Sequence, residues 1–154
     1  MIPISDINPA KNNPVISRIF IFGSILIYIL IQPKNPNELF NFFYEFAAIP
    51  CEILYNTPLS ADQYYNNDCA IGSSNIVFEN KNILLSLLLS NLFHANFVHI
   101  LGNLWSFWIF GNNIEDVLGK LRFILFLSFT GIASMFSHIF LNFNDINPIV
   151  GASG

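Results

Sequence analysis

A few polar side chains stand in an otherwise apolar stretch of the chain. His94, His99 and Asn103 lie within a run from Asn82 to Ile114 that contains no Asp, Glu, Lys or Arg. His99 and Asn103 are four residues apart, a spacing that puts both side chains on one face of an α-helix. An unpaired polar group is costly in lipid, so this face should meet other protein or a water-filled cavity. We therefore favour a functional role for this pair over a packing role.

Other polar residues near this face suggest packing rather than chemistry. Asn96 and Ser106 continue the same helical stripe, and we expect them to hydrogen-bond between helices. His138 belongs to a later apolar segment, where it shares a face with small residues, and a packing role is favoured there as well. The small residues of that face are Ser128, Gly131 and Ser134.

A serine between small residues near the end of the chain is a candidate nucleophile. Ser153 lies in the sequence GASG, between Gly151 and Gly154, where small neighbours would allow a substrate to approach closely. A helix starting here would supply free backbone N–H groups close to the hydroxyl. The motif is not the G-x-S-x-G elbow of soluble hydrolases. A turn or a helix N-cap is the simpler interpretation of GASG taken alone.

Two cofactor hypotheses compete with hydrolysis. His94 and His99 do not have the spacing of a zinc-binding H-E-x-x-H motif, and no acidic residue lies near them, so we predict no metal site. A haem held between His99 and His138 is the alternative outside proteolysis. No organic cofactor is otherwise indicated.

The composition indicates a membrane protein. Of the 154 residues, 53% are hydrophobic and only 10% are charged, whereas roughly a quarter are charged in soluble domains. The formal net charge is −4. Because no large basic patch exists, binding to nucleic acid is excluded.

Apolar segments predict an all-α, polytopic fold in contact with the lipid bilayer. A cytoplasmic segment, 1–14, precedes a first spanning helix at about 15–31, for which a signal peptide is the competing interpretation. The run 83–114 is too long for one crossing, so we expect a re-entrant piece followed by a spanning helix from about residue 96. A third spanning helix is expected at about 121–141, and a fourth should start from 151.

The long connection 32–82 should lie outside the cytoplasm. It carries six acidic residues and two lysines, whereas basic residues flank the start of the first helix and the short connection between the second and third. The positive-inside rule then places the N-terminus in the cytoplasm. Cys51 and Cys69 both fall in this loop, and the sequence leaves open whether they pair. In this topology His94, His99, Asn103 and GASG share the outer side of the membrane.

These residues together resemble a known family. HANFVHILGN, FGNNIEDVLGKLRFILF and GASG are similar to motifs of the rhomboid intramembrane serine proteases, and the N-terminal IPISDINPAKNNPV and FAAIPCEIL resemble the bacterial members. The similarity runs over nearly the whole chain. The H-x-x-x-x-H-x-x-x-N array followed by G-x-S-G is much more specific than either motif alone.

The resemblance implies a function for each motif. Ser153 would attack a peptide bond in a transmembrane segment of a membrane-protein substrate. His99 and Asn103, with the Ser153 backbone N–H, would bind the oxyanion, and His94 would support them. Glu115 would have a structural role at the cytoplasmic end. A bacterial-type plasma membrane is the implied location.

The resemblance also implies that a catalytic group is missing from these residues. The family's dyad histidine follows G-x-S-G by three helices, and His94, His99 and His138 do not match it. Loss of the base can cost a serine hydrolase about six orders of magnitude, so we expect these 154 residues alone to be inactive. A partial gene product and a broken reading frame are favoured over a shortened relative that binds transmembrane clients without cleaving them.

Overall fold

The computed structural model describes residues 11–151, and within them every regular element is a helix. The predicted all-α fold class is therefore confirmed for this part of the chain. In chain order the helices are α1 (Val15–Leu26) with a π-helical turn η1 (Ile27–Ile31), α2 (Pro36–Phe46), α3 (Pro50–Tyr55), α4 (Ala61–Asn66), α5 (Ile83–Leu89) with a 3₁₀ turn η2 (Ser90–Leu92), α6 (Phe97–Leu118) and α7 (Lys120–Leu141).

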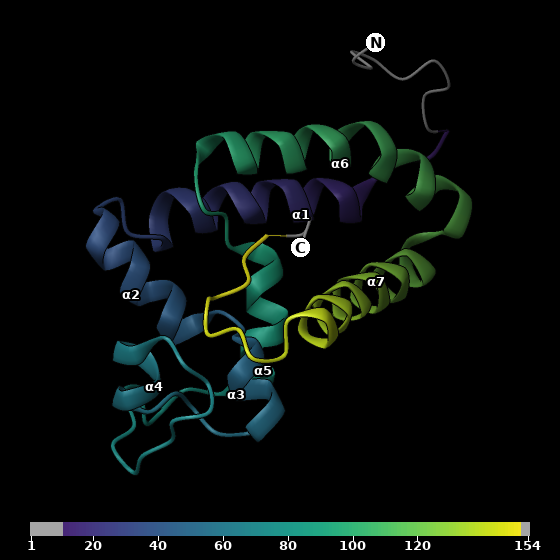
Figure 1. Ribbon diagram of the computed structural model, residues 1–154. Coiled ribbons are helices and arrows are strands. Elements are labelled where there is room, and N and C mark those ends of the chain that lie inside the picture. Colours follow the sequence, from purple (N-terminus) through teal and green to yellow (C-terminus); the bar gives the residue numbers. More distant parts are fainter. Residues whose placement is uncertain (1–10, 152–154) are drawn as a thin grey trace.

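The three longest helices form one end of the molecule. Figure 1 shows α6 alongside α1 and running in the opposite direction, with α7 beneath them and α5 between α7 and the loop helices. The long loop, with α2, α3 and α4, forms the other end. The last described residues return from α7 toward the space between α1 and α5 (Figure 1).

Among the described residues, one helix is by itself long and apolar enough to cross a membrane. This helix is Lys120–Leu141. The pair Ile83–Leu92 and Phe97–Leu118 meets the same criteria together, but the axis turns by 79° between them. The apolar helix Val15–Ile31 is shorter. These helices indicate one span, or two if the bent pair counts as one, so the expected three spans remain a proposal.

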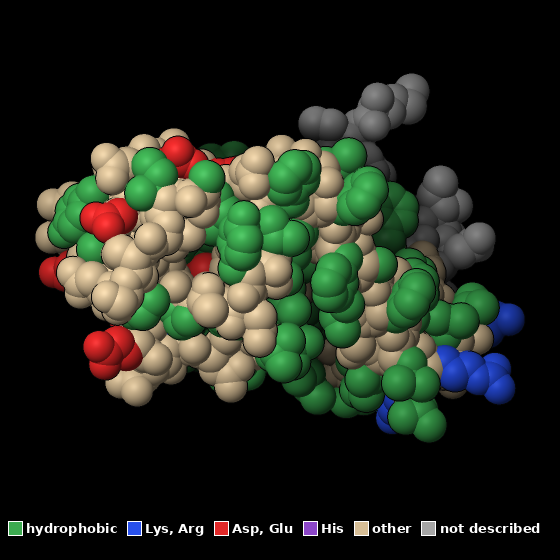
Figure 2. Space-filling model, turned by 60° about the horizontal axis from the view of Figure 1, so that its bottom comes forward, with side chains coloured by type: hydrophobic (Ala, Val, Ile, Leu, Met, Phe, Trp, Pro, Cys, Tyr) green, Lys and Arg blue, Asp and Glu red, His purple; other side chains and the backbone are tan. Residues whose placement is uncertain are grey.

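On one face of the molecule, acidic and basic side chains lie at opposite ends. Figure 2 shows acidic side chains at the end formed by the long loop, Lys and Arg at the opposite end, and hydrophobic side chains across the surface between them. Exposed hydrophobic residues include Leu84 of α5 and Phe129 of α7, which are 72% and 73% exposed. Such a surface suits an apolar environment better than water.

A buried carboxylate joins α6 to the start of α1. The two carboxylate oxygens of Glu115 accept hydrogen bonds from the backbone N–H groups of Ile16 (3.0 Å) and Ser17 (2.8 Å) and from the Ser17 hydroxyl (2.8 Å). The first N–H groups of a helix have no partner within the helix, and a negative charge there also interacts favourably with the helix dipole. Glu115 therefore caps α1 from a different helix.

Replacing Glu115 with Ala should lower the free energy of unfolding by about 1–3 kcal/mol, because buried donors of α1 lose their acceptor. Thermal unfolding in detergent micelles measures the effect. The neighbouring substitution Asp116→Ala is the control, since that carboxylate holds the exposed backbone of Lys11 and Asn12. A loss in the control equal to that in Glu115→Ala would contradict the role of burial.

The long loop is closed by a disulfide between Cys51 and Cys69. This settles, for the folded chain, the pairing that the sequence left open. Both cysteines are buried in a cluster with Tyr44, Ile49 and Leu59. The loop therefore has a small hydrophobic core of its own.

Candidate active site

The first turns of α6 present the polar face predicted from the sequence. Asn96 is the N-cap of this helix, and its side chain accepts a hydrogen bond from the backbone N–H of His99 at 2.9 Å. This differs from the expected hydrogen bond between helices, because the chain turns sharply here and the new helix start needs an acceptor. His99 and Asn103 follow on consecutive turns and are half-buried, whereas Ser106 is exposed.

The segment after α7, residues 145–151, is held by backbone hydrogen bonds to distant parts of the chain. The Cys51 N–H donates to the carbonyl of Asp145 at 3.1 Å, and the Ile149 N–H donates to the carbonyl of Ala48 at 2.8 Å in an antiparallel bridge. The Gly151 N–H donates to the carbonyl of Ser90 at 2.8 Å. We call residues 145–151 the C-terminal segment. It lies between the start of α3 and the end of α5.

This segment ends directly against the polar face of α6. Gly151 has φ +100°, and a Cβ atom added there would lie 2.5 Å from Nε2 of His99 and 3.5 Å from Nδ2 of Asn103. Only glycine tolerates both this backbone conformation and this close approach. The structure therefore brings Gly151 next to His99 and Asn103, which precede it by about fifty residues in the sequence. Ser153 and Gly154 lie outside the described residues.

His94 lies in the break between η2 and α6. Its side chain is buried, and its ring centroid is 5.4 Å from that of His99 with the two planes nearly perpendicular. Within residues 11–151 neither ring nitrogen of His94 has a hydrogen-bond partner. The imidazole therefore packs between the ring of His99 and the backbone of Leu92, next to the candidate site.

Gln32 fixes the backbone of His94. Its side-chain oxygen accepts from the His94 N–H at 3.0 Å, and its side-chain nitrogen donates to the His94 carbonyl at 2.9 Å. Gln32 is 3% exposed. This residue was not identified from the sequence, because a single glutamine at the end of an apolar segment carries no motif. Its burial and its reciprocal pair of hydrogen bonds appear only in the fold.

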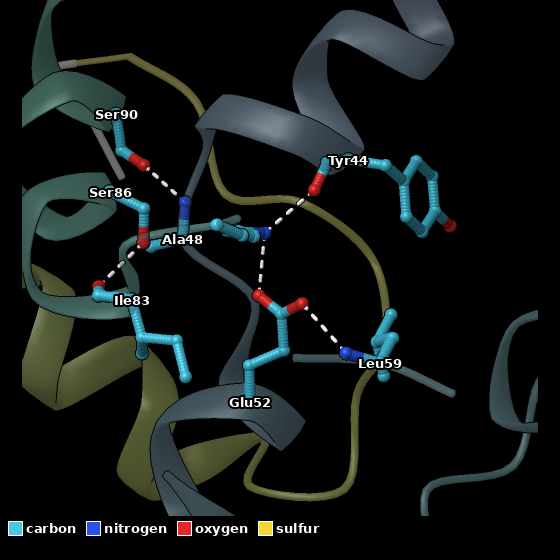
Figure 3. Close-up of polar contacts among 8 residues, drawn as sticks. Tyr44, Ala48, Glu52, Leu59, Ile83, Ser86 and Ser90 are labelled. Atoms are coloured by element: carbon cyan, nitrogen blue, oxygen red, sulfur yellow. Dashed lines mark hydrogen bonds and ion pairs between the residues drawn. The ribbon is translucent and has the colours of Figure 1, made fainter. Parts of the chain in front are cut away.

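Ser90 is a second residue that the sequence analysis did not single out. Its hydroxyl accepts a hydrogen bond from the backbone N–H of Ala48 at 2.6 Å, while its carbonyl binds Gly151. Figure 3 shows this contact beside Ser86, whose hydroxyl donates to the carbonyl of Ile83 at 2.7 Å. The signal was the pair of serines, four residues apart, in the apolar sequence ILLSLLLSNLF.

The remaining predicted residues lie farther along their helices. His138 is in the last turn of α7, where its carbonyl accepts from the Asn142 N–H at 3.0 Å. Glu115 lies near the other end of α6, where it caps α1. Within the described part of the chain there is no cluster of three or more His, Cys, Asp or Glu side chains suited to a metal ion.

Comparison with known proteins supports a family assignment. Residues 81–154, which include α5, α6, α7 and the C-terminal segment, match the family model described as the Rhomboid domain. Searches of the curated proteins and of the solved structures returned no match. The matched region contains His94, His99, Asn103 and Gly151, the residues that the structure brings together. Residues 81–154 therefore carry a Rhomboid domain, and this match supports assignment of the chain to the rhomboid family.

Proposed function

We propose that these residues contribute the nucleophile, Ser153, and the oxyanion site of a rhomboid-type intramembrane serine protease. The observation that carries the proposal is the contact of Gly151 with His99 and Asn103. Gly151 precedes Ser153 by two residues in the sequence, and in this proposal Ser153 would act beside these two polar side chains. The substrates would be transmembrane segments of other membrane proteins.

The residues would divide the chemistry as follows. The Ser153 hydroxyl would attack the scissile carbonyl, whose oxygen gains negative charge. His99, Asn103 and the Ser153 N–H would donate hydrogen bonds to that oxygen, which is how preorganised donors lower the barrier to acyl transfer. His94, packed against His99, would hold its ring in place. The group that accepts the proton of Ser153 is not assigned to any of the three histidines.

The same proposal includes a membrane orientation. We propose three spanning helices, with the N-terminus in the cytoplasm and the long loop outside. The separation of acidic from basic side chains supports this, because positively charged segments tend to remain in the cytoplasm (Figure 2). The Cys51–Cys69 disulfide supports it too, since disulfides persist in oxidising compartments.

Labelling with a fluorophosphonate tests the proposed nucleophile. The natural protein that carries these residues is purified in detergent and treated with the probe, and the labelled site is found by mass spectrometry. We expect the label on Ser153, and its loss in Ser153→Ala. Ser106→Ala is the matched control, because this exposed serine lies on the same helix as His99 and should not affect labelling. A folded protein that does not label, or that still labels after Ser153→Ala, would refute the proposal.

A further inference from the structure

We infer that the disulfide loop, residues 51–69, positions the C-terminal segment against α6. The inference concerns these two parts of the chain and stands on their contacts. Only its consequence for catalysis rests on the proposed function. The disulfide loop would then be a part of the candidate active site, although it lies far from Ser153 in sequence.

The first contact joins the disulfide directly to the start of the C-terminal segment. Cys51 itself provides the N–H that binds the carbonyl of Asp145. The next residue, Ile146, is 2% exposed and packs in the same cluster as Cys51 and Cys69. Backbone and side chain of the segment are therefore both held at the disulfide.

The second contact lies three residues before Cys51. Ala48 binds the Ile149 N–H through its carbonyl, and its own N–H donates to the Ser90 hydroxyl (Figure 3). Ile149 packs with Ala48 in a second buried cluster that also contains Met135 of α7. The C-terminal segment thus packs into two hydrophobic clusters in succession. In the second cluster it contacts Ala48, which lies three residues before Cys51, where the disulfide loop begins.

The elements that carry these contacts need the disulfide to stay in place. α3 has 6 residues and so does α4, whereas isolated helices shorter than about 12–15 residues are marginal in water. A cross-link removes conformational freedom that such a loop would otherwise have. The hydrogen bonds at Ile149 and Ser90 hold Gly151 in place. If the disulfide loop became mobile and Ile149 were displaced, the contact between Gly151 and His99 would therefore change as well.

Hydrogen exchange of the Ile149 and Gly151 amides measures this positioning directly. We compare the chain in detergent micelles with the double variant Cys51→Ala/Cys69→Ala. We expect exchange at these two amides to be faster by about 10²-fold, as follows from loss of a cross-link that closes a loop of this size. Amides in the middle of α7 should exchange as before. Unchanged protection of both amides would overturn the inference.

Two further variants keep the result interpretable. Ile146→Ala leaves the disulfide intact but removes the side chain that packs on it, and it should also accelerate exchange at Ile149. This variant decides the question if the double variant fails to fold. Ser17→Ala is the matched control, because it removes a buried hydrogen bond to Glu115 without touching the segment. Acceleration at Ile149 in this control equal to that in Ile146→Ala would overturn the inference.

The measurement is independent of any chemistry at Ser153. If Ser153 does not label in the unaltered protein, the proposed protease activity fails while the exchange result stands. If the protein labels and exchange in the double variant is unchanged, the positioning role fails while the proposed activity stands.

Discussion

Replacing Gly151 with Ala should slow the reaction of Ser153 with a fluorophosphonate by about 10²-fold or more, because a displacement of about 1 Å in an active site has this cost. The added methyl group would lie 2.5 Å from Nε2 of His99, well inside contact distance. The backbone at φ +100° is also unfavourable for alanine. Either His99, a proposed oxyanion donor, or the C-terminal segment, which precedes Ser153 in the sequence, must move.

Two measurements separate the local displacement from general loss of structure. The labelling rate is measured in the natural protein, and hydrogen exchange of the Ile149 amide is measured in the chain described above. Exchange at Ile149 should accelerate as the segment is displaced, while amides of α7 stay protected. Retention of the full labelling rate would contradict the close contact between Gly151 and His99.

Gly102→Ala is the matched control for this substitution. Gly102 lies on α6 between His99 and Asn103, and a Cβ atom added there would meet no atom of residues 11–151 within 4 Å. The same methyl group should therefore leave both the labelling rate and the exchange of Ile149 unchanged. A comparable loss in both variants would show that alanine disturbs α6 rather than the contact at Gly151.

Local sequence patterns explain the helices and the polar face of α6. Helix periodicity depends on neighbouring residues, so the spacing of His99 and Asn103 already predicted a shared face. Unbroken apolar runs likewise indicated helices near those now described as α6 and α7. The number of membrane spans did not follow as clearly, because the run 83–114 bends by 79° at a break set by the Asn96 cap.

The contacts that assemble the site could not be predicted in this way. The C-terminal segment binds Ala48, Cys51 and Ser90 through backbone groups, and every residue type except proline offers the same backbone groups. Gln32 holds His94 across 62 positions of the chain, with no motif on either side. The pairing of Cys51 with Cys69 was open for a related reason, since two cysteines alone do not specify a disulfide. Such contacts depend on how distant segments pack.

The long loop also contains a buried ion pair that no sequence pattern indicated. Nζ of Lys81 lies 2.5 Å from Oε2 of Glu52, and both side chains are 1% exposed. Glu52 also accepts from the Leu59 N–H at 3.0 Å, and the Lys81 ammonium donates to the carbonyl of Tyr44 at 2.7 Å. Figure 3 shows the Glu52 carboxylate turned toward the Leu59 backbone, beside Tyr44. The pair links α3, the end of α2 and the segment before α5.

Replacing Lys81 with Met should lower the free energy of unfolding by about 3–5 kcal/mol, because a buried charge then loses its partner. Chemical or thermal unfolding in micelles measures the loss. Lys34→Met is the matched control, since Lys34 is exposed and its ammonium lies over the Tyr28 ring rather than in a buried pair. The double variant Glu52→Gln/Lys81→Met should recover much of the loss, because it removes the unpaired charge and keeps an acceptor for Leu59. Equal losses in the single and double variants would contradict an electrostatic origin.

The loss in Lys81→Met should also depend on pH. Burial raises the pKa of the Glu52 carboxyl, and the charge of Lys81 and the Leu59 hydrogen bond oppose that rise. Without Lys81 the pKa of Glu52 should rise further in the folded state. A group whose folded pKa is raised favours the folded state below its unfolded pKa, and this advantage is lost as the pH rises through the folded value. The stability difference from the unaltered chain should therefore shrink as the pH falls toward the ordinary pKa of glutamate. A difference that grows on acidification would mean that Glu52 does not take up the proton, and that loss of packing around the Lys81 side chain dominates instead.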